Sequence, residues 1–219
     1  MIDIQPVLAS LSARRPIFHS EADLQHELAH ELRAHDPGLA LRLEYPIGTA
    51  KRASLDILLR KGGARFGIEL KYLCRSADVT FDEERFALKH QSAHDIRRYD
   101  VVKDITRMER FTERFGAEAA VLVLSNDPAY WSSRRRLGTI DAAFDLCDLG
   151  RLTGTLGWAT GAGAGTMKGR TDPLIVSGSY DLRWHDYSDL GGHGGRFRYL
   201  YVPIARPTAA RADPPVKTG

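Results

Sequence analysis

The chain has 219 residues, enough for one domain whose hydrophobic core needs no disulfide or structural metal. Its hydrophobic share of 43% and charged share of 27% are ordinary for a soluble globular protein, and no apolar run is long enough to span a bilayer. The net charge of +3 permits an anionic partner without requiring one.

The cysteines and the N-terminal residues bear on the compartment. Cys74 and Cys147 lie far apart and form no C-x-x-C motif, which predicts reduced thiols. The first sixteen residues lack a basic segment followed by an apolar one, as a signal peptide would have. We therefore expect a cytoplasmic protein with no membrane association.

The N-terminal half gives clear element predictions. Ser20 to Asp23 fits a capping box that opens a helix, and Gly62-Gly63 fits the turn of a hairpin. The expected elements are a helix to about residue 34, an alternating strand at 39–47, a hairpin at 54–73, a polar irregular stretch at 74–89, a long helix at about 90–114 and a strand buried on both faces at 119–127.

The C-terminal half is less regular. We expect a short helix within 132–150, a glycine-rich stretch at 157–173, strands within 177–190 and 196–206, and a disordered tail at 206–219. The glycine-rich stretch is not a phosphate loop, because Lys168 is followed by Gly169; it is either a linker or a mobile loop over substrate. One domain over residues 1–205 is expected, with a core at about 18–127 and a C-terminal elaboration at 128–205.

The first helix carries His26-Glu27-Leu28-Ala29-His30, the H-E-x-x-H pattern of zinc peptidases. On a helical wheel the two histidines lie opposite the apolar stripe of leucines 24, 28 and 32. A zinc peptidase would bury its histidines, so the pattern favours solvated side chains. A zinc peptidase stays as an alternative, which predicts bound zinc that is lost on His26→Ala.

Glu21 falls inside the same leucine stripe. A carboxylate that faces the core is costly unless something compensates for it. The helix dipole is one explanation for Glu21, since acidic residues stabilise a first turn, but it does not explain the inward position of this residue. A cation inside would explain both features.

The hairpin brings two further carboxylates together. With a two-residue turn, Lys61 pairs with Ala64 and Asp56 falls opposite Glu69. The same register gives one fully apolar face, made by Leu55, Ile57, Leu59, Phe66, Ile68, Leu70 and Tyr72. Opposed side chains have Cβ atoms about 4.5 to 5.5 Å apart, so two carboxylates there can share a divalent cation. Oxygen ligands favour Mg²⁺ or Mn²⁺.

Two neighbours of this pair support a reactive site. Lys71 lies on the same face as Glu69, so its ammonium can reach a water or phosphate oxygen beside the metal. Gly67 leaves room for a substrate backbone. The alternative is an exposed hairpin face with a Glu69–Lys71 ion pair.

This set of residues and elements resembles the PD-(D/E)XK nuclease superfamily, with its restriction-endonuclease-like fold, over roughly residues 18 to 127. Leu55 stands where the motif name has proline. The resemblance implies an α/β (α+β) protein with an αβββαβ core, a mixed central sheet flanked by helices, and extra C-terminal strands. It also implies metal ligation by Asp56, Glu69, the Leu70 carbonyl and Glu21, with Lys71 orienting or activating the attacking water.

The implied activity is a Mg²⁺- or Mn²⁺-dependent deoxyribonuclease that hydrolyses phosphodiester bonds, with DNA as the expected partner. A homodimer is one arrangement that would pair two such sites by symmetry. The alternative from another class is a nucleic-acid-binding protein that keeps this fold without catalysis.

Two basic segments are candidates for contacts with nucleic acid. Arg134, Arg135 and Arg136 form an uninterrupted run beside Trp131, which suits phosphates or a surface loop equally well. Arg97 belongs to the long helix, where acids and bases alternate; an ion-paired helix face is slightly favoured there.

Overall fold

The computed structural model describes residues 3–48, 54–133 and 138–206. The helices are α1 (Ile4–Arg14), α2 (Glu21–His35), α3 (His94–Phe115) and α4 (Ala164–Met167), with a 3₁₀ turn at Ala142–Phe144. The strands are β1 (Ala40–Pro46), β2 (Ser54–Lys61), β3 (Ala64–Leu73), β4 (Ala77–Phe81), β5 (Glu84–Leu88), β6 (Glu118–Ser125), β7 (Arg151–Leu156), β8 (Leu174–Asp181), β9 (Trp184–Asp189) and β10 (Arg196–Ile204).

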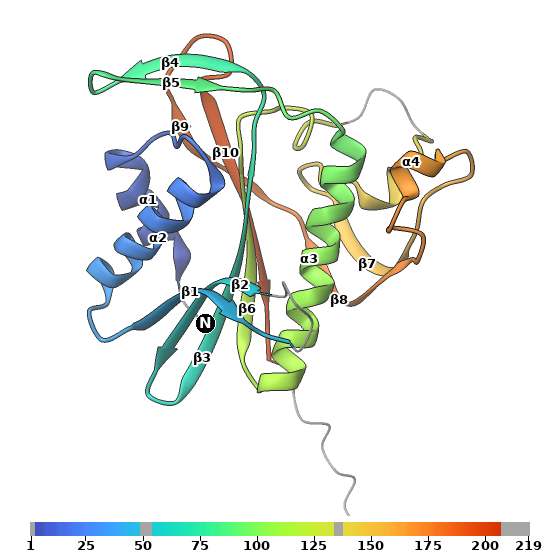
Figure 1. Ribbon diagram of the computed structural model, residues 1–219, viewed down its shortest axis with the longest axis horizontal. Coiled ribbons are helices and arrows are strands. Elements are labelled where there is room, and N and C mark those ends of the chain that lie inside the picture. The colour runs from blue at the N-terminus through green and yellow to red at the C-terminus, as the bar shows by residue number, and fades with distance from the viewer. Residues whose placement is uncertain (1–2, 49–53, 134–137, 207–219) are drawn as a thin grey trace, which may run out of the picture.

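A six-stranded mixed sheet organises the molecule, with strand order β1-β2-β3-β6-β10-β9. Strands β3 and β6 run parallel, and the other neighbours are antiparallel. Helices α1 and α2 cover one face of the sheet and α3 covers the other (Figure 1). The mixed α/β architecture with flanking helices is therefore confirmed. Strand β6 is buried along nearly its whole length, as its continuous apolar sequence predicts.

Helix α2 faces as the wheel predicts. The Ser20 hydroxyl caps it by accepting a hydrogen bond from the Asp23 N–H at 3.2 Å. The leucine stripe is buried, whereas His26 and His30 are exposed. Glu27 is ion-paired with Arg14 of α1 at 2.7 Å, so it serves the packing of two helices.

The hairpin register is also confirmed. Gly62 and Gly63 adopt φ of 55° and 81°, as a tight type I′ turn requires, and Lys61 pairs with Ala64. The ladder continues to Ile57–Ile68, one step short of Asp56 and Glu69. One detail of the predicted apolar face is wrong. Leu55 packs with the α3 cluster, on the opposite face from Ile57, because regular pairing is lost at Asp56.

Several elements differ from expectation. Residues 74–89, predicted to be irregular, contain the β4–β5 hairpin, which projects beyond the main sheet (Figure 1). Helix α1 and strand β7 were not predicted, and α3 begins four residues later than expected. The C-terminal region contributes β9 and β10 to the central sheet, and β7–β8 form a separate hairpin. The predicted tail lies outside the described residues, except for Arg206.

The glycine-rich stretch lies over α3. The Trp158 ring stacks on Tyr99 with centroids 5.5 Å apart, and its indole N–H donates to the Arg170 carbonyl at 3.0 Å. These contacts anchor the segment to the core cluster on the α3 side. They give the two ends of the segment a packing role.

Gly67 serves the packing of α3. A Cβ atom at this position would lie 2.9 Å from Phe111 Cε1 and 3.0 Å from Leu55 Cδ2. The space that the glycine leaves is therefore filled by the helix and by the neighbouring strand. The prediction that it leaves room for a substrate backbone is wrong.

Replacing Gly67 by alanine should lower the free energy of unfolding by about 1–3 kcal/mol, because the added methyl overpacks the α3 interface. Gly157→Ala is the matched control, since the nearest atom to its added Cβ is 3.8 Å away. Denaturant unfolding of the two variants checks the difference. Equal stability of Gly67→Ala and the native protein would contradict this account of the packing.

Candidate active site

Two carboxylates meet the backbone of β3 just beyond the point where β2 stops pairing with it. Asp56 accepts a hydrogen bond from the Leu70 N–H at 2.6 Å, and Glu21 accepts one from the Tyr72 N–H at 2.8 Å. The recorded β2–β3 pairs end at Ile57–Ile68, so these side chains replace partners that a longer ladder would supply. The sequence thus brings an acid from β2 and an acid from α2 to one stretch of backbone.

The Lys71 side chain reaches towards α3. Its ammonium donates to the Leu70 carbonyl at 2.9 Å and lies 3.0 Å from a carboxylate oxygen of Asp104. Glu69 is farther from it, at 3.9 Å. The alternative of a simple Glu69–Lys71 pair on an exposed face is therefore wrong: Glu69 is buried, and the main partner of Lys71 is Asp104.

Arg107 of α3 completes the cluster. Its guanidinium forms a close ion pair with Glu69 and lies 3.2 Å from Asp104. Within the described ranges, Glu69 Oε2 is buried and has no hydrogen-bond partner. One oxygen of Glu69 is therefore paired with arginine. The other oxygen is buried without the hydrogen-bond donor or cation that a buried carboxylate oxygen normally has.

Burial and neighbouring charges set the protonation of this cluster. Burial raises the pKa of Asp56, and Glu21 and Glu44 raise it further against the opposing effect of the Leu70 N–H. Burial also raises the pKa of Asp104 to about 6. Burial alone would lower the pKa of Lys71, but the carboxylates around it, Asp104 first, outweigh that effect and raise it. Lys71 is therefore an ammonium ion at neutral pH.

Glu44 and Gln25 lie on the other side of Asp56. The Gln25 amide donates to Glu44 at 2.9 Å and to the Asp56 carbonyl at 2.8 Å. Glu44 has φ of 49°, and the β1–β2 ladder skips it between the pairs Leu43–Ile57 and Tyr45–Leu55. Gln25 of α2 thus hydrogen-bonds to both strands at the point where the regular β1–β2 pairing is interrupted at Asp56.

The four predicted residues Glu21, Asp56, Glu69 and Lys71 are all brought to this region, although Glu21 stays exposed. Sequence reasoning missed Asp104 and Arg107. A signal for Asp104 was present, because it lies three positions after Val101 and four before Met108, within the apolar stripe of α3. An acid inside an apolar stripe is the same anomaly that identified Glu21.

The donor set suits a hard cation in its chemistry. Carboxylate oxygens and a backbone carbonyl are the ligands that Mg²⁺ and Mn²⁺ prefer, and the unpartnered Glu69 Oε2 fits such a role. However, no group of three His, Cys, Asp or Glu residues in the described part of the chain is arranged to hold a metal ion. Arg107 stands against Glu69, so metal binding there requires the guanidinium to move.

A pocket of about 530 Å³ opens beside the cluster, and both Glu21 and Lys71 line it. Arg97, predicted to contact nucleic acid, lies in its wall and is exposed. Arg134, Arg135 and Arg136 lie outside the described residues. Cys74 also lines the pocket, and burial raises the pKa of its thiol to about 12. Cys74 is a free thiol, as predicted.

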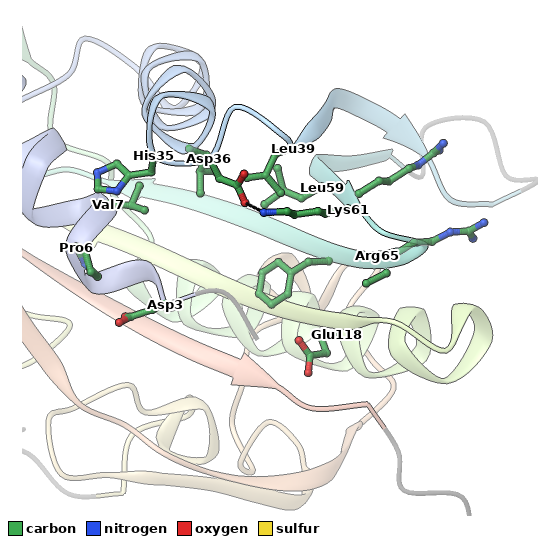
Figure 2. A pocket seen from close by; sticks show the side chains of 14 residues that line it. Asp3, Pro6, Val7, His35, Asp36, Leu39, Leu59, Lys61, Arg65 and Glu118 are labelled. Carbon is green, nitrogen blue, oxygen red and sulfur yellow. Dashed lines mark hydrogen bonds and ion pairs between the residues drawn. The ribbon is translucent and has the colours of Figure 1, made fainter.

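A second pocket, of about 390 Å³, lies between α1, the end of α2 and the β2–β3 turn (Figure 2). Apolar side chains such as Val7, Leu39 and Leu59 line it, and a Lys61–Asp36 ion pair of 2.5 Å lies at its side. None of the four predicted catalytic residues lines this pocket. It is therefore separate from the carboxylate cluster.

Within the described ranges, no helix combines the length and the apolar composition needed to cross a membrane. Comparison with known proteins finds no family model, no curated protein and no solved structure that matches this chain.

Proposed function

We propose that the protein is a divalent-metal-dependent nuclease of the PD-(D/E)XK type, which hydrolyses phosphodiester bonds of DNA. The observation that carries the proposal is the meeting of Asp56, Glu69 and Lys71 around one segment of β3, with Glu21 beside it. Apart from the β4–β5 hairpin inserted between β3 and α3, the order α2, β1, β2, β3, α3, β6, with β3 parallel to β6, agrees with the αβββαβ core that the resemblance implies. The second candidate is a DNA-binding protein with the same fold and no catalysis.

The carboxylates of Asp56 and Glu69, the Leu70 carbonyl and Glu21 are the groups that would hold Mg²⁺ or Mn²⁺. When bound, such an ion lowers the pKa of a water, polarises the scissile phosphate and neutralises charge on the leaving oxygen. Each ligand comes from a rigid helix or strand, which suits a site that must hold its geometry.

Lys71 has a defined part in this proposal. A general base must be deprotonated at the working pH, and the raised pKa of Lys71 keeps it protonated. Its ammonium therefore orients the attacking water and places a positive charge where the phosphate becomes more negative. Asp104, 3.0 Å away, keeps the side chain in place.

Arg107 provides the positive charge that Glu69 and Asp104 need while no cation is bound. Burial lowers the pKa of Arg107, yet its guanidinium remains charged at neutral pH. Exchange of arginine for a divalent ion at Glu69 keeps a positive charge beside the carboxylate and raises the local charge by one. The proposal therefore includes a movement of Arg107 on metal binding.

The test is incubation of the purified protein with plasmid DNA and with single-stranded DNA in Mg²⁺, in Mn²⁺ and in EDTA. We expect cleavage that needs the metal and is unchanged in His26→Ala, because His26 is exposed on the far side of α2. DNA binding without cleavage in either metal would contradict the nuclease and favour the binding protein. Stoichiometric zinc that is lost in His26→Ala would instead indicate a zinc peptidase.

A further inference from the structure

The pocket beside the carboxylate cluster is formed by four separate elements. The start of α2, the end of β3, the end of β5 and the beginning of α3 with the residues before it supply its walls. Glu21 and Lys71 belong both to the pocket and to the candidate active site. A ligand in this pocket is therefore in contact with the groups that would carry out the reaction.

The charged lining favours an anion. Lys71, Lys89 and Arg97 line the pocket and carry positive charge, whereas Glu21 is the one acidic residue in its described lining. Lys89 and Arg97 are both exposed and lie on the wall formed by the β5–α3 connection and α3. Two basic side chains that flank a pocket next to a phosphodiester site suit the phosphates of a nucleic acid strand.

His19 gives the pocket a flat aromatic surface. Its ring stacks on Phe86 of β5, with centroids 4.3 Å apart and planes 18° apart. A ring nitrogen lies 2.8 Å from Glu84, and the backbone N–H donates to Asp23 at 2.9 Å. The side chain is still 47% exposed and lines the pocket, so part of the ring is accessible to a ligand. Stacking of bases on such fixed aromatic faces is a common mode of single-strand recognition.

We propose that this pocket binds one unpaired nucleotide next to the scissile phosphate, with its base on His19 and its phosphates near Lys89 and Arg97. The substrate is then single-stranded DNA or a frayed end, in place of continuous duplex. The pocket volume lies in the range of sites for single small ligands, and a base must leave the duplex stack to enter such a site. The position beside a scissile phosphate rests on the proposed nuclease function.

The test measures binding without cleavage. A fluorescein-labelled five-nucleotide oligothymidylate and a blunt duplex are titrated with the full chain in EDTA, with fluorescence anisotropy as the readout. We expect the single strand to bind at least about 10-fold more tightly than the duplex. His19→Ala should weaken single-strand binding by about 10-fold, which is within the range for loss of one stacked base, and His19→Phe should retain it. Lys89→Ala and Arg97→Ala should each weaken it as well.

His26→Ala and Lys103→Ala are the controls, because both side chains are exposed and neither lines the pocket. Equal affinity for strand and duplex, or equal effects of His19→Ala and His26→Ala, would overturn the proposal. If the native protein still cleaves DNA in that case, the result contradicts only the nucleotide pocket and leaves the proposed nuclease function in place. If the expected binding pattern appears without cleavage in Mg²⁺ or Mn²⁺, the pocket stands as the site of a binding protein and the nuclease falls.

Discussion

Asp56→Asn should reduce metal-dependent DNA cleavage by about 10³-fold, an effect typical of losing one essential electrostatic group. Asparagine keeps an oxygen that can accept the Leu70 N–H but removes the negative charge that a hard cation needs. Burial raises the pKa of Asp56, so the fold disfavours its charged form and neutralisation should not lower stability. Initial rates on supercoiled plasmid in Mg²⁺ measure the effect.

Asp36→Asn is the matched control, because Asp36 is a carboxylate paired with Lys61 away from the carboxylate cluster. We expect it to cleave at the native rate. Calorimetric titration with Mn²⁺ provides a second readout, in which Asp56→Asn should bind the ion more weakly than the native protein does. If Asp56→Asn cleaved DNA at the native rate, Asp56 would not be part of the catalytic site.

Glu109→Ala should lower the free energy of unfolding by about 2–4 kcal/mol, because it leaves three part-buried donors without their charged acceptor. Glu109 of α3 is 6% exposed and accepts hydrogen bonds from the N–H groups of Ser177 and Gly178 and from the Tyr180 hydroxyl, at 2.7–3.0 Å. The β7–β8 ladder shifts register between Thr153 and Gly154, opposite these two N–H groups. The carboxylate thus accepts hydrogen bonds from the N–H groups that the β-bulge leaves without a partner in the β7–β8 ladder.

Denaturant unfolding measures this loss, with Glu113→Ala as the control, since Glu113 is exposed one turn farther along α3. Glu109→Gln should be intermediate, because its amide oxygen can accept from the same donors but its NH₂ group cannot. A loss below about 1 kcal/mol for Glu109→Ala would mean that water replaces the carboxylate at the bulge.

The sequence predicted best where local chemistry decides the structure. The hairpin register follows from two glycines and an alternation of period two, so the pairing of Lys61 with Ala64 could be derived without any tertiary information. The orientation of α2 followed from its leucine stripe in the same way. These two elements placed Asp56, Glu69 and Glu21 near one another.

The errors concern features that depend on tertiary contacts. Asp104 and Arg107 belong to the long helix, whose mixed charges were predicted to form an ion-paired surface. That prediction compared the charged residues with one another and did not compare their positions with the apolar stripe of the helix. Gly67 was read as an opening for a ligand, but an approaching helix fills the same space. The β4–β5 hairpin has a polar sequence with two non-glycine residues at positive φ in its turn, and it carries no standard turn signal.

The position of β10 has a consequence for how the protein is made. This strand, the last in the described chain, lies between β6 and β9 and pairs with β6 over seven residues. While a ribosome synthesises the chain, one side of β6 therefore has no antiparallel neighbour until about 80 further residues have emerged, since Ser125 and Ile204 mark the ends of the two strands. An apolar strand with an open edge is prone to pair with other chains, so this interval is when the nascent polypeptide is most exposed to aggregation through β6.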